Sequence, residues 1–365
     1  MAVSRLYVPS LIVSVLAFLS VSSCVSLKTS LDKRGLQDIA AVLAGGPDIP
    51  DPEVIQSYLQ SYKESSVHYL DLPFEPVSMD RESFTRWKLS DKKAGGPVIA
   101  EKLSFGTTLG LPDGSLDTGY FYLFHREPLA GGKAILWAPG FGVSDFAFNF
   151  IHTFIETALA QGWSVLVWVP PYHLERMQQG KKAGEGLIST DLRSLLSAMR
   201  SSAWELAAGI AWLEAQGITR VGAWGGSFGA ANLLMLGEAY KFDHLSLMIP
   251  LIDWLSVWQS QALVPVHARF AKAGYSSEFI ASILGTISPK GHIPLTPPDR
   301  IQFLYARHDQ VSPEQLVLDY AASLGKPEVH AFNESHGTIL LNSRVYKAYG
   351  KFLERMNLSP AECGS

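Results

Sequence analysis

Three residues in the second half of the chain have the types needed for nucleophilic catalysis, in the order Ser227, Asp309, His336. Ser227 lies in VGAWGGSFGAANLL (residues 221–234), where a short apolar run meets two glycines and an alanine-rich segment follows. A serine hydroxyl alone is a poor nucleophile, so a histidine must take its proton and later return it to the leaving group. An aspartate on the other ring nitrogen fixes the tautomer and stabilises the imidazolium. These residue types therefore indicate acyl transfer through Ser227.

Each of the three residues follows a predicted strand, over residues 220–224, 301–305 and 328–332. Ligands of open α/β sheets bind beyond the carboxyl ends of the strands, so all three side chains are expected at one edge of the sheet. Among the ten histidines, His336 is the best candidate because it lies in a loop beside Gly337. A side chain at Gly225 or Gly229 would collide with the adjacent strand or helix, since the serine must stand on a tight turn.

The elements that must position these residues alternate between strand and helix. Nearly continuous apolar runs predict strands buried on both faces of a parallel sheet, at 134–138, 164–169, 220–224, 245–249, 301–305 and 328–332. Segments 97–106 and 116–125, with the turn Pro112-Asp113-Gly114 between them, predict an antiparallel hairpin at the sheet edge. Helices are expected at 145–161, at 191–216, and from an N-cap at Ser312, with Pro313 in the first helical position, to Gly325. The fold class is therefore α/β, with a doubly wound, mostly parallel sheet.

The G-x-S-x-G turn between a strand and a helix, together with the order Ser, Asp, His, resembles the α/β-hydrolase superfamily over residues 97–357. The resemblance implies that Asp309 orients His336, because the family usually places its acid at this later strand end. Asp253, after the 245–249 strand, is the rival acid. Asp309 also has a non-catalytic alternative, because a helix is expected to start three residues later and an aspartate near a helix N-terminus is favourable in any case.

The resemblance also implies an oxyanion hole from the backbone of Phe228 and of Phe141. The loop Pro139-Gly140-Phe141-Gly142 is similar to the family's His-Gly-x-Gly, but proline stands in place of the histidine. This leaves the N–H groups available and puts the supporting hydrogen bonds of the loop in doubt.

Two long insertions interrupt the alternation, at 170–190 and at about 253–299, and insertions of this length are more often lids or binding loops than passive connections. We expect the second to form a cap, with Trp254, Trp258 and Phe270 as candidates to line an apolar pocket under it. Tyr172 and His173 should face the same end of the sheet, and an interior or loop-stabilising role for His173 is favoured over a catalytic one.

The first 23 residues have the pattern of a signal peptide, with Arg5, the apolar run 11–21 and small residues before Cys24. Val21-Ser22-Ser23-Cys24 resembles the lipobox of bacterial lipoproteins, which implies acyl chains on Cys24 and a membrane anchor, in the outer membrane rather than the inner because Val25 follows. The alternative is an ordinary cleaved signal.

Residues 24–95 are expected to be an N-terminal extension, either packed on the 96–357 domain or serving as a spacer, with no grouping of reactive residues. Residues 358–365 are a tail.

Composition, charge and the motifs that are missing argue against several classes of function. The 365 residues carry a formal net charge of −4 with no basic stripe, which argues against nucleic acid as a partner. No metal-ligand spacing and no phosphate-cradling loop is evident, so neither a metal nor a cofactor is expected. The sequence thus predicts a serine hydrolase that cleaves an ester-like bond in a small-molecule or lipid-like substrate at a membrane surface. An amidase or peptidase of the same fold, or a catalytically silent lipoprotein that binds a ligand or partner, are the alternatives.

Overall fold

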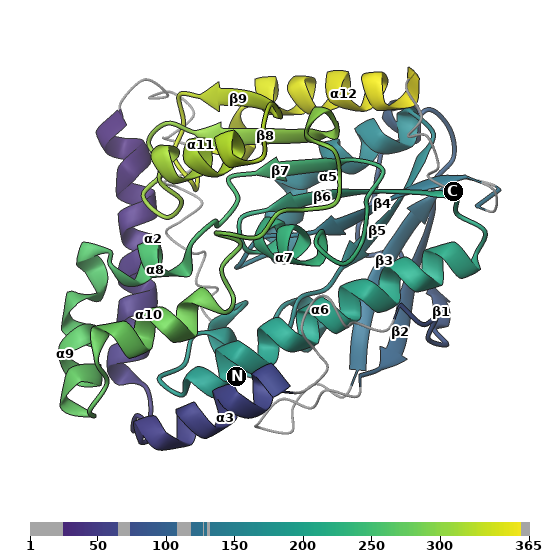
Figure 1. Cartoon of the computed structure of the whole chain (residues 1–365). Helices are drawn as coiled ribbons and strands as arrows, with labels where there is room; N and C mark the ends of the chain where they lie inside the picture. The colour runs from purple at the N-terminus through teal and green to yellow at the C-terminus, as the bar shows by residue number, and fades with distance from the viewer. Residues whose placement is uncertain (1–24, 65–73, 108–117, 127, 130–131, 359–365) are drawn as a thin grey trace, which may run out of the picture.

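The computed structural model describes residues 25–64, 74–107, 118–126, 128–129 and 132–358 (Figure 1). The predicted signal peptide, Cys24, the predicted turn at residues 112–114 and the tail after residue 358 lie outside the described residues. In the described part of the chain, nine strands form one sheet in the order β1-β2-β3-β5-β4-β6-β7-β8-β9. The strands are β1 (Asp80–Ser83), β2 (Ile99–Gly106), β3 (Thr118–His125), β4 (Lys133–Ala138), β5 (Trp163–Trp168), β6 (Arg220–Gly226), β7 (Leu245–Met248), β8 (Ile301–Ala306) and β9 (Glu328–Phe332).

The first three strands are antiparallel to their neighbours, and β5, β4 and β6 to β9 are parallel. All six predicted parallel strands and the β2–β3 hairpin are present, so the predicted doubly wound, mostly parallel α/β fold is confirmed. The edge strand β1 was not predicted. Its four residues are all exposed, so its sequence lacks the apolar alternation by which a half-buried strand is recognised.

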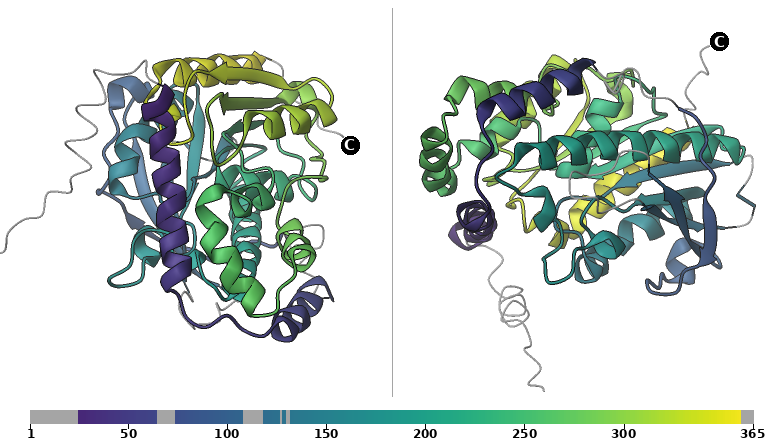
Figure 2. Two further views of the ribbon diagram at one scale, coloured as in Figure 1. Left: turned by 90° about the vertical axis from the view of Figure 1, so that its left-hand side faces the viewer. Right: turned by 90° about the horizontal axis from the view of Figure 1, so that it is seen from below.

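Helices cover both faces of the sheet (Figure 2). The α-helices of the described residues are α2 (Val25–Gly45), α3 (Pro52–Glu64), α4 (Asp91–Ala94), α5 (Asp145–Ala160), α6 (Leu192–Ala215), α7 (Phe228–Leu236), α8 (Trp254–Trp258), α9 (Val264–Lys272), α10 (Ser277–Gly285), α11 (Glu314–Ser323) and α12 (Ser343–Leu358). Successive side chains of a strand point to opposite faces, so Ile135 and Trp137 of β4 join the core under α5 and α12, whereas Leu136 and Ala138 join the core under α6, α7 and α11.

The predicted start of α11 was wrong. The helix begins at Glu314 with Pro313 as its N-cap, so Ser312 is not the cap. The Ser312 hydroxyl instead donates to the carbonyl of Pro250, and its N–H donates to Asp309 Oδ1 at 2.7 Å. These tertiary contacts give the serine a partner outside the helix.

The N-terminal helix α2 packs on the rest of the protein, across the carboxyl ends of the strands and beside α8 and α9 (Figure 1). Arg269 of α9 donates to the carbonyls of Leu43, Gly46 and Pro47 and so holds the end of α2. The insertion at 253–299 contributes α8, α9 and α10 to this same end of the molecule. No helix in the described residues is long and apolar enough to cross a membrane.

Candidate active site

Ser227 stands on a tight turn between β6 and α7. Its φ of 49° and ψ of −115° are unfavourable for a residue with a side chain, and its N–H donates to the carbonyl of Met248 at 2.9 Å. A Cβ at Gly229 would lie 1.9 Å from the carbonyl oxygen of Ala138, and one at Gly225 would lie 2.8 Å from the backbone of α7. The collisions expected from the sequence are therefore present, and both glycines are required for this turn.

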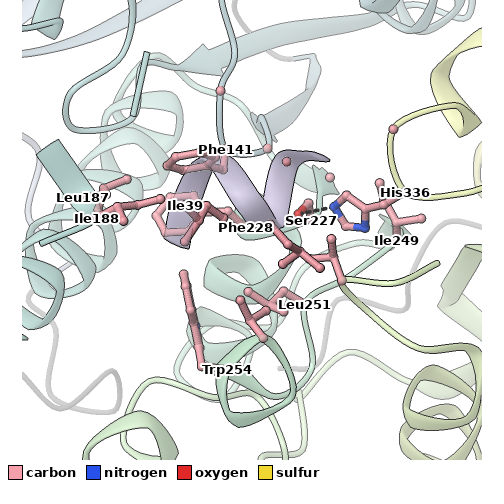
Figure 3. Close-up of a pocket in the computed structure, with 18 of the residues that line it drawn as sticks. Ile39, Phe141, Leu187, Ile188, Ser227, Phe228, Ile249, Leu251, Trp254 and His336 are labelled. Atoms are coloured by element: carbon pink, nitrogen blue, oxygen red, sulfur yellow. Dashed lines mark hydrogen bonds between the residues drawn. The ribbon is translucent and has the colours of Figure 1, made fainter. Parts of the chain in front are cut away.

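The structure brings Ser227, His336 and Asp309 into hydrogen-bond contact. Figure 3 shows the bond between Ser227 and His336. His336 Nδ1–H donates to Asp309 Oδ2 at 2.7 Å, which leaves Nε2 free to accept the Ser227 hydroxyl at 2.8 Å. The other oxygen of Asp309 accepts the N–H groups of Val311 and Ser312 at 2.8 and 2.7 Å. The carboxylate thus holds the turn before α11 and the histidine at the same time.

Asp253, the other aspartate considered as the partner of His336, has different partners. Asp253 caps α8 by accepting the N–H of Leu255 at 2.9 Å, and its second oxygen pairs with Lys290 at 3.0 Å. The aspartate in contact with His336 is Asp309.

Asp32 of α2 is a residue that sequence reasoning missed, and it holds the loop that carries the histidine. Asp32 is buried, with 4% of the residue exposed. It accepts the N–H of His336 and of Gly337, both at 3.0 Å, the hydroxyl of Ser335 at 2.9 Å, and the N–H of Gln310 at 3.1 Å. Helix α2, in the predicted N-terminal extension, therefore contributes a buried charged side chain to the site.

The surroundings of His336 raise its pKa above the ordinary value of 6.5. Burial by itself lowers this pKa, but the charge and hydrogen bond of Asp309 and the charge of Asp32 outweigh the burial. A higher pKa makes the neutral imidazole a stronger base, which suits a group that must take a proton from a serine hydroxyl.

Phe141 and Phe228 flank the serine. A Cβ on Gly140 would lie 3.4 Å from Ser227 Cβ, so the loop after β4 packs against Ser227. Phe228 is the first residue of α7, where backbone N–H groups have no partner within the helix. Neither the Phe141 N–H nor the Phe228 N–H donates to another group in the described part of the chain, so both are available to an oxyanion.

The loop after β4 is supported by a histidine from the loop after β5. The Gly142 N–H donates to His173 Nε2 at 2.9 Å, and His173 Nδ1–H donates to the carbonyl of Pro171 at 2.7 Å. The His173 ring also lies edge-to-face with the ring of Phe141, 5.6 Å between centroids. A Cβ on Gly184 would meet both rings, at 2.5 and 2.7 Å, so the 170–190 loop closes over them. The favoured loop-stabilising role of His173 agrees with this geometry.

Burial keeps the His173 ring neutral, so that its Nε2 can accept a hydrogen bond, and a buried ion pair anchors the loop that carries it. Burial lowers the pKa of His173 to about 4, the charge of Arg176 acts in the same direction, and the bond to Pro171 opposes them, so the ring is neutral at physiological pH. Arg176 in turn forms a fully buried bidentate pair with Glu205 of α6, with both contacts at 2.7 Å. The backbone of the loop turns sharply before this anchor, with positive φ at Tyr172 and Leu174.

A cavity of about 420 Å³ extends from Ser227 between α2, the 170–190 loop and the 253–299 insertion (Figure 3). Of its lining residues in the described part of the chain, only Asp32 and His336 ionise. The rest are mainly apolar, and they include the three aromatic residues expected under the cap, Trp254, Trp258 and Phe270. Helix α2, which was not expected there, adds Leu31, Leu36, Ile39 and Leu43. The cavity thus suits an uncharged, apolar group.

Among the described residues, no group of three or more His, Cys, Asp or Glu side chains could hold a metal ion.

The fold is shared with solved structures of low sequence identity. An acetyl xylan esterase of Thermoanaerobacterium sp. is 15% identical with a TM-score of 0.52, and the match covers 89% of this chain and 97% of that one. A cold-adapted esterase from an Arctic intertidal metagenomic library is 15% identical with a TM-score of 0.50, over 76% of this chain and 99% of that one. No protein-family model and no curated protein sequence matches the chain. The chain therefore has the α/β-hydrolase type of fold, a doubly wound and mostly parallel sheet, that it shares with these esterases.

Proposed function

We propose that the protein is a serine esterase that cleaves a carboxylic ester through an acyl-enzyme on Ser227. The observation that carries this proposal is the chain of hydrogen bonds from Ser227 through His336 to Asp309, at 2.8 and 2.7 Å, at the end of an apolar cavity. Two structurally similar proteins are esterases by name, which favours an ester over an amide as the bond cleaved.

In the first half of the reaction, Ser227 Oγ attacks the ester carbonyl carbon while its proton passes to His336 Nε2. The N–H groups of Phe141 and Phe228 stabilise the oxyanion of the tetrahedral intermediate, assisted by the positive end of α7. As the intermediate collapses, the C–O bond to the alcohol breaks and His336 gives its proton to the departing oxygen. Asp309 keeps the imidazole in the required tautomer and stabilises its charged form.

In the second half, a water molecule attacks the acyl-enzyme and gives a proton to His336 Nε2. The second tetrahedral intermediate then collapses, Ser227 recovers the proton, and the carboxylic acid leaves. No metal or redox cofactor takes part in either step.

The cavity supports an apolar acyl group as the part of the substrate that is bound. Residues 253–299 form the cap over this group, together with α2. Because neither a Lys nor an Arg lines the cavity in the described residues, an anionic acyl chain would be desolvated without a partner.

The test is covalent labelling by a fluorophosphonate probe, together with turnover of nitrophenyl esters of short and long acyl chains and of a matched anilide. Wild type should be labelled and should turn over the esters, whereas Ser227→Ala should show neither. Ser282→Ala, which removes an exposed hydroxyl on α10, is the matched control and should behave as wild type. Turnover that persists in Ser227→Ala contradicts the mechanism, faster turnover of the anilide indicates an amidase, and an unlabelled wild type favours a ligand-binding role.

We also propose that Cys24 is acylated and anchors the protein to a bacterial membrane surface, in the outer membrane rather than the inner. The support is the sequence Val21-Ser22-Ser23-Cys24 after an apolar run. Cys24→Ala should move the protein from the membrane fraction to the soluble fraction of cells, and continued membrane association would contradict the anchor.

A further inference from the structure

Helix α2 places a buried carboxylate against the backbone of the catalytic histidine. Asp32 accepts four hydrogen bonds, three of them from the consecutive residues Ser335, His336 and Gly337 and one from Gln310, next to Asp309. One side chain therefore ties the loop of the base to the loop of the acid. A buried carboxylate is costly unless its oxygens are hydrogen-bonded, and here both oxygens have two donors each.

A second residue of α2, one turn earlier, extends this contact. The Lys28 ammonium donates to the carbonyl of Asn333 at 2.5 Å and pairs with Glu334 at 2.9 Å. Lys28 and Asp32 are both buried, at 6% and 4% exposed, on the same face of the helix. Residues 333–337 are thus held by α2 along their whole length, and a change in the position of α2 would move His336.

We propose that Asp32 is a positioning residue for His336 and that helix α2 is a working part of the active site rather than a spacer. This inference rests on the proposed serine esterase function. Asp32 fixes the backbone from which the imidazole extends, so Nε2 stays within reach of Ser227 Oγ, and its negative charge favours the imidazolium that forms when the serine proton is transferred.

The charge effect can be separated from a purely structural role. The charged groups that face His336 are Asp309, from the loop after β8, and Asp32, from α2. Lys28 and Glu334, the next charged groups along this contact, pair with each other. Replacing Asp32 by the nearly isosteric asparagine removes one of the two negative charges that raise the pKa of His336, so the pKa falls. Because a general base works only when it is neutral, the acidic limb of the rate profile then moves to lower pH.

The experiment compares Asp32→Asn with wild type in pH profiles of kcat/KM for a nitrophenyl ester, with rates normalised to the sites labelled by a fluorophosphonate. Asp38→Asn removes an exposed carboxylate from the outer side of α2 and is the matched control. We expect kcat of Asp32→Asn to fall about 10- to 100-fold, the effect of a small misplacement of a catalytic group. We also expect its acidic limb to move to lower pH, while Asp38→Asn retains the wild-type profile.

When rates are normalised to the labelled sites at each pH, the midpoint of the acidic limb does not depend on how much of the protein is folded, so it is informative even if Asp32→Asn is partly unfolded. A second variant, Asp32→Glu, keeps the charge but changes its reach. It should lose kcat and keep the limb near its wild-type position. An acidic limb unchanged in Asp32→Asn overturns the inference, whatever happens to kcat. If wild type itself is not labelled and does not turn over, the proposed function fails instead, so the two failures are distinguishable.

Discussion

Replacing His173 with alanine tests whether the loop that carries Phe141 depends on a side chain from a different loop. The substitution removes the acceptor of the Gly142 N–H, which is 2.9 Å from His173 Nε2. A buried donor left without a partner costs about 1–3 kcal/mol. The loop can recover this energy by turning the peptide between Phe141 and Gly142, which would also displace the carbonyl and N–H groups next to the oxyanion.

If that full free energy is lost from the transition state, kcat falls about 5- to 150-fold. Complete loss of one oxyanion donor sets the upper bound, at about 10²- to 10³-fold. KM should change little, because the donor acts on charge that develops only in the transition state. The acidic limb of the profile should stay in place, since burial keeps the pKa of His173 at about 4, below the pH range in which His336 titrates.

The assay is steady-state hydrolysis of a nitrophenyl ester, with thermal unfolding measured alongside. His152→Ala, on α5, replaces a half-buried histidine away from the cavity and is the matched control. A folded His173→Ala protein with kcat within threefold of wild type would refute the dependence of the oxyanion loop on this side chain. A large rise in KM at unchanged kcat would show that His173 affects substrate binding instead.

Three further outcomes follow from the geometry of the site. In Gly229→Ala the new Cβ would lie 1.9 Å from a backbone carbonyl oxygen, so we expect probe labelling to be lost and the free energy of unfolding to fall by about 1–3 kcal/mol or more. The control is Gly285→Ala, whose Cβ meets nothing within 4 Å and which should behave as wild type in the same assays. The acidic limb of the wild-type kcat/KM profile should have its midpoint above pH 6.5, because the pKa of His336 is raised and protonation removes the base as pH falls. A midpoint below pH 6.5 would contradict the assignment of His336 as the base. Across nitrophenyl esters of increasing acyl-chain length, kcat/KM should rise about fourfold per methylene until the cavity is full, because burying one CH₂ contributes about 0.8 kcal/mol. A kcat/KM that does not change with chain length would exclude the cavity as the acyl site.

Much of the sheet could be predicted because parallel strands buried on both faces have nearly continuous apolar sequences. β4 and β5 are examples, since almost every residue in them is buried. One rule, that polar residues just after such strands meet at the same edge of the sheet, then placed Ser227 and His336 together. The rule fitted Asp253 as well as Asp309, and only the family resemblance favoured Asp309.

The parts that could not be predicted depend on contacts between distant segments. The sequence raised a question about Pro139 and favoured a loop-stabilising role for His173. It did not show that the loop stabilised is the one after β4, where His173 accepts a bond from Gly142. For Asp32 a weak indication existed. Lys28 and Asp32 are four residues apart, and the buried Leu36 lies four residues further along, so two charged residues share the face that carries the apolar residues of α2. Charged residues in that position need buried partners, but the helix pattern does not say which loop supplies them.

The contacts of Asp32 also bear on when the protein can become active during its synthesis. They join residues 303 to 305 positions apart, so one partner is made among the first residues of the chain and the other near the end. Contacts of such long separation form late, because the intervening chain must first be ordered. In the proposed mechanism, a nascent or prematurely terminated chain that contains Ser227 but ends before residue 336 lacks the base. We therefore expect the proposed activity to begin only after translation has passed residue 336 and α2 has reached the loop that carries His336.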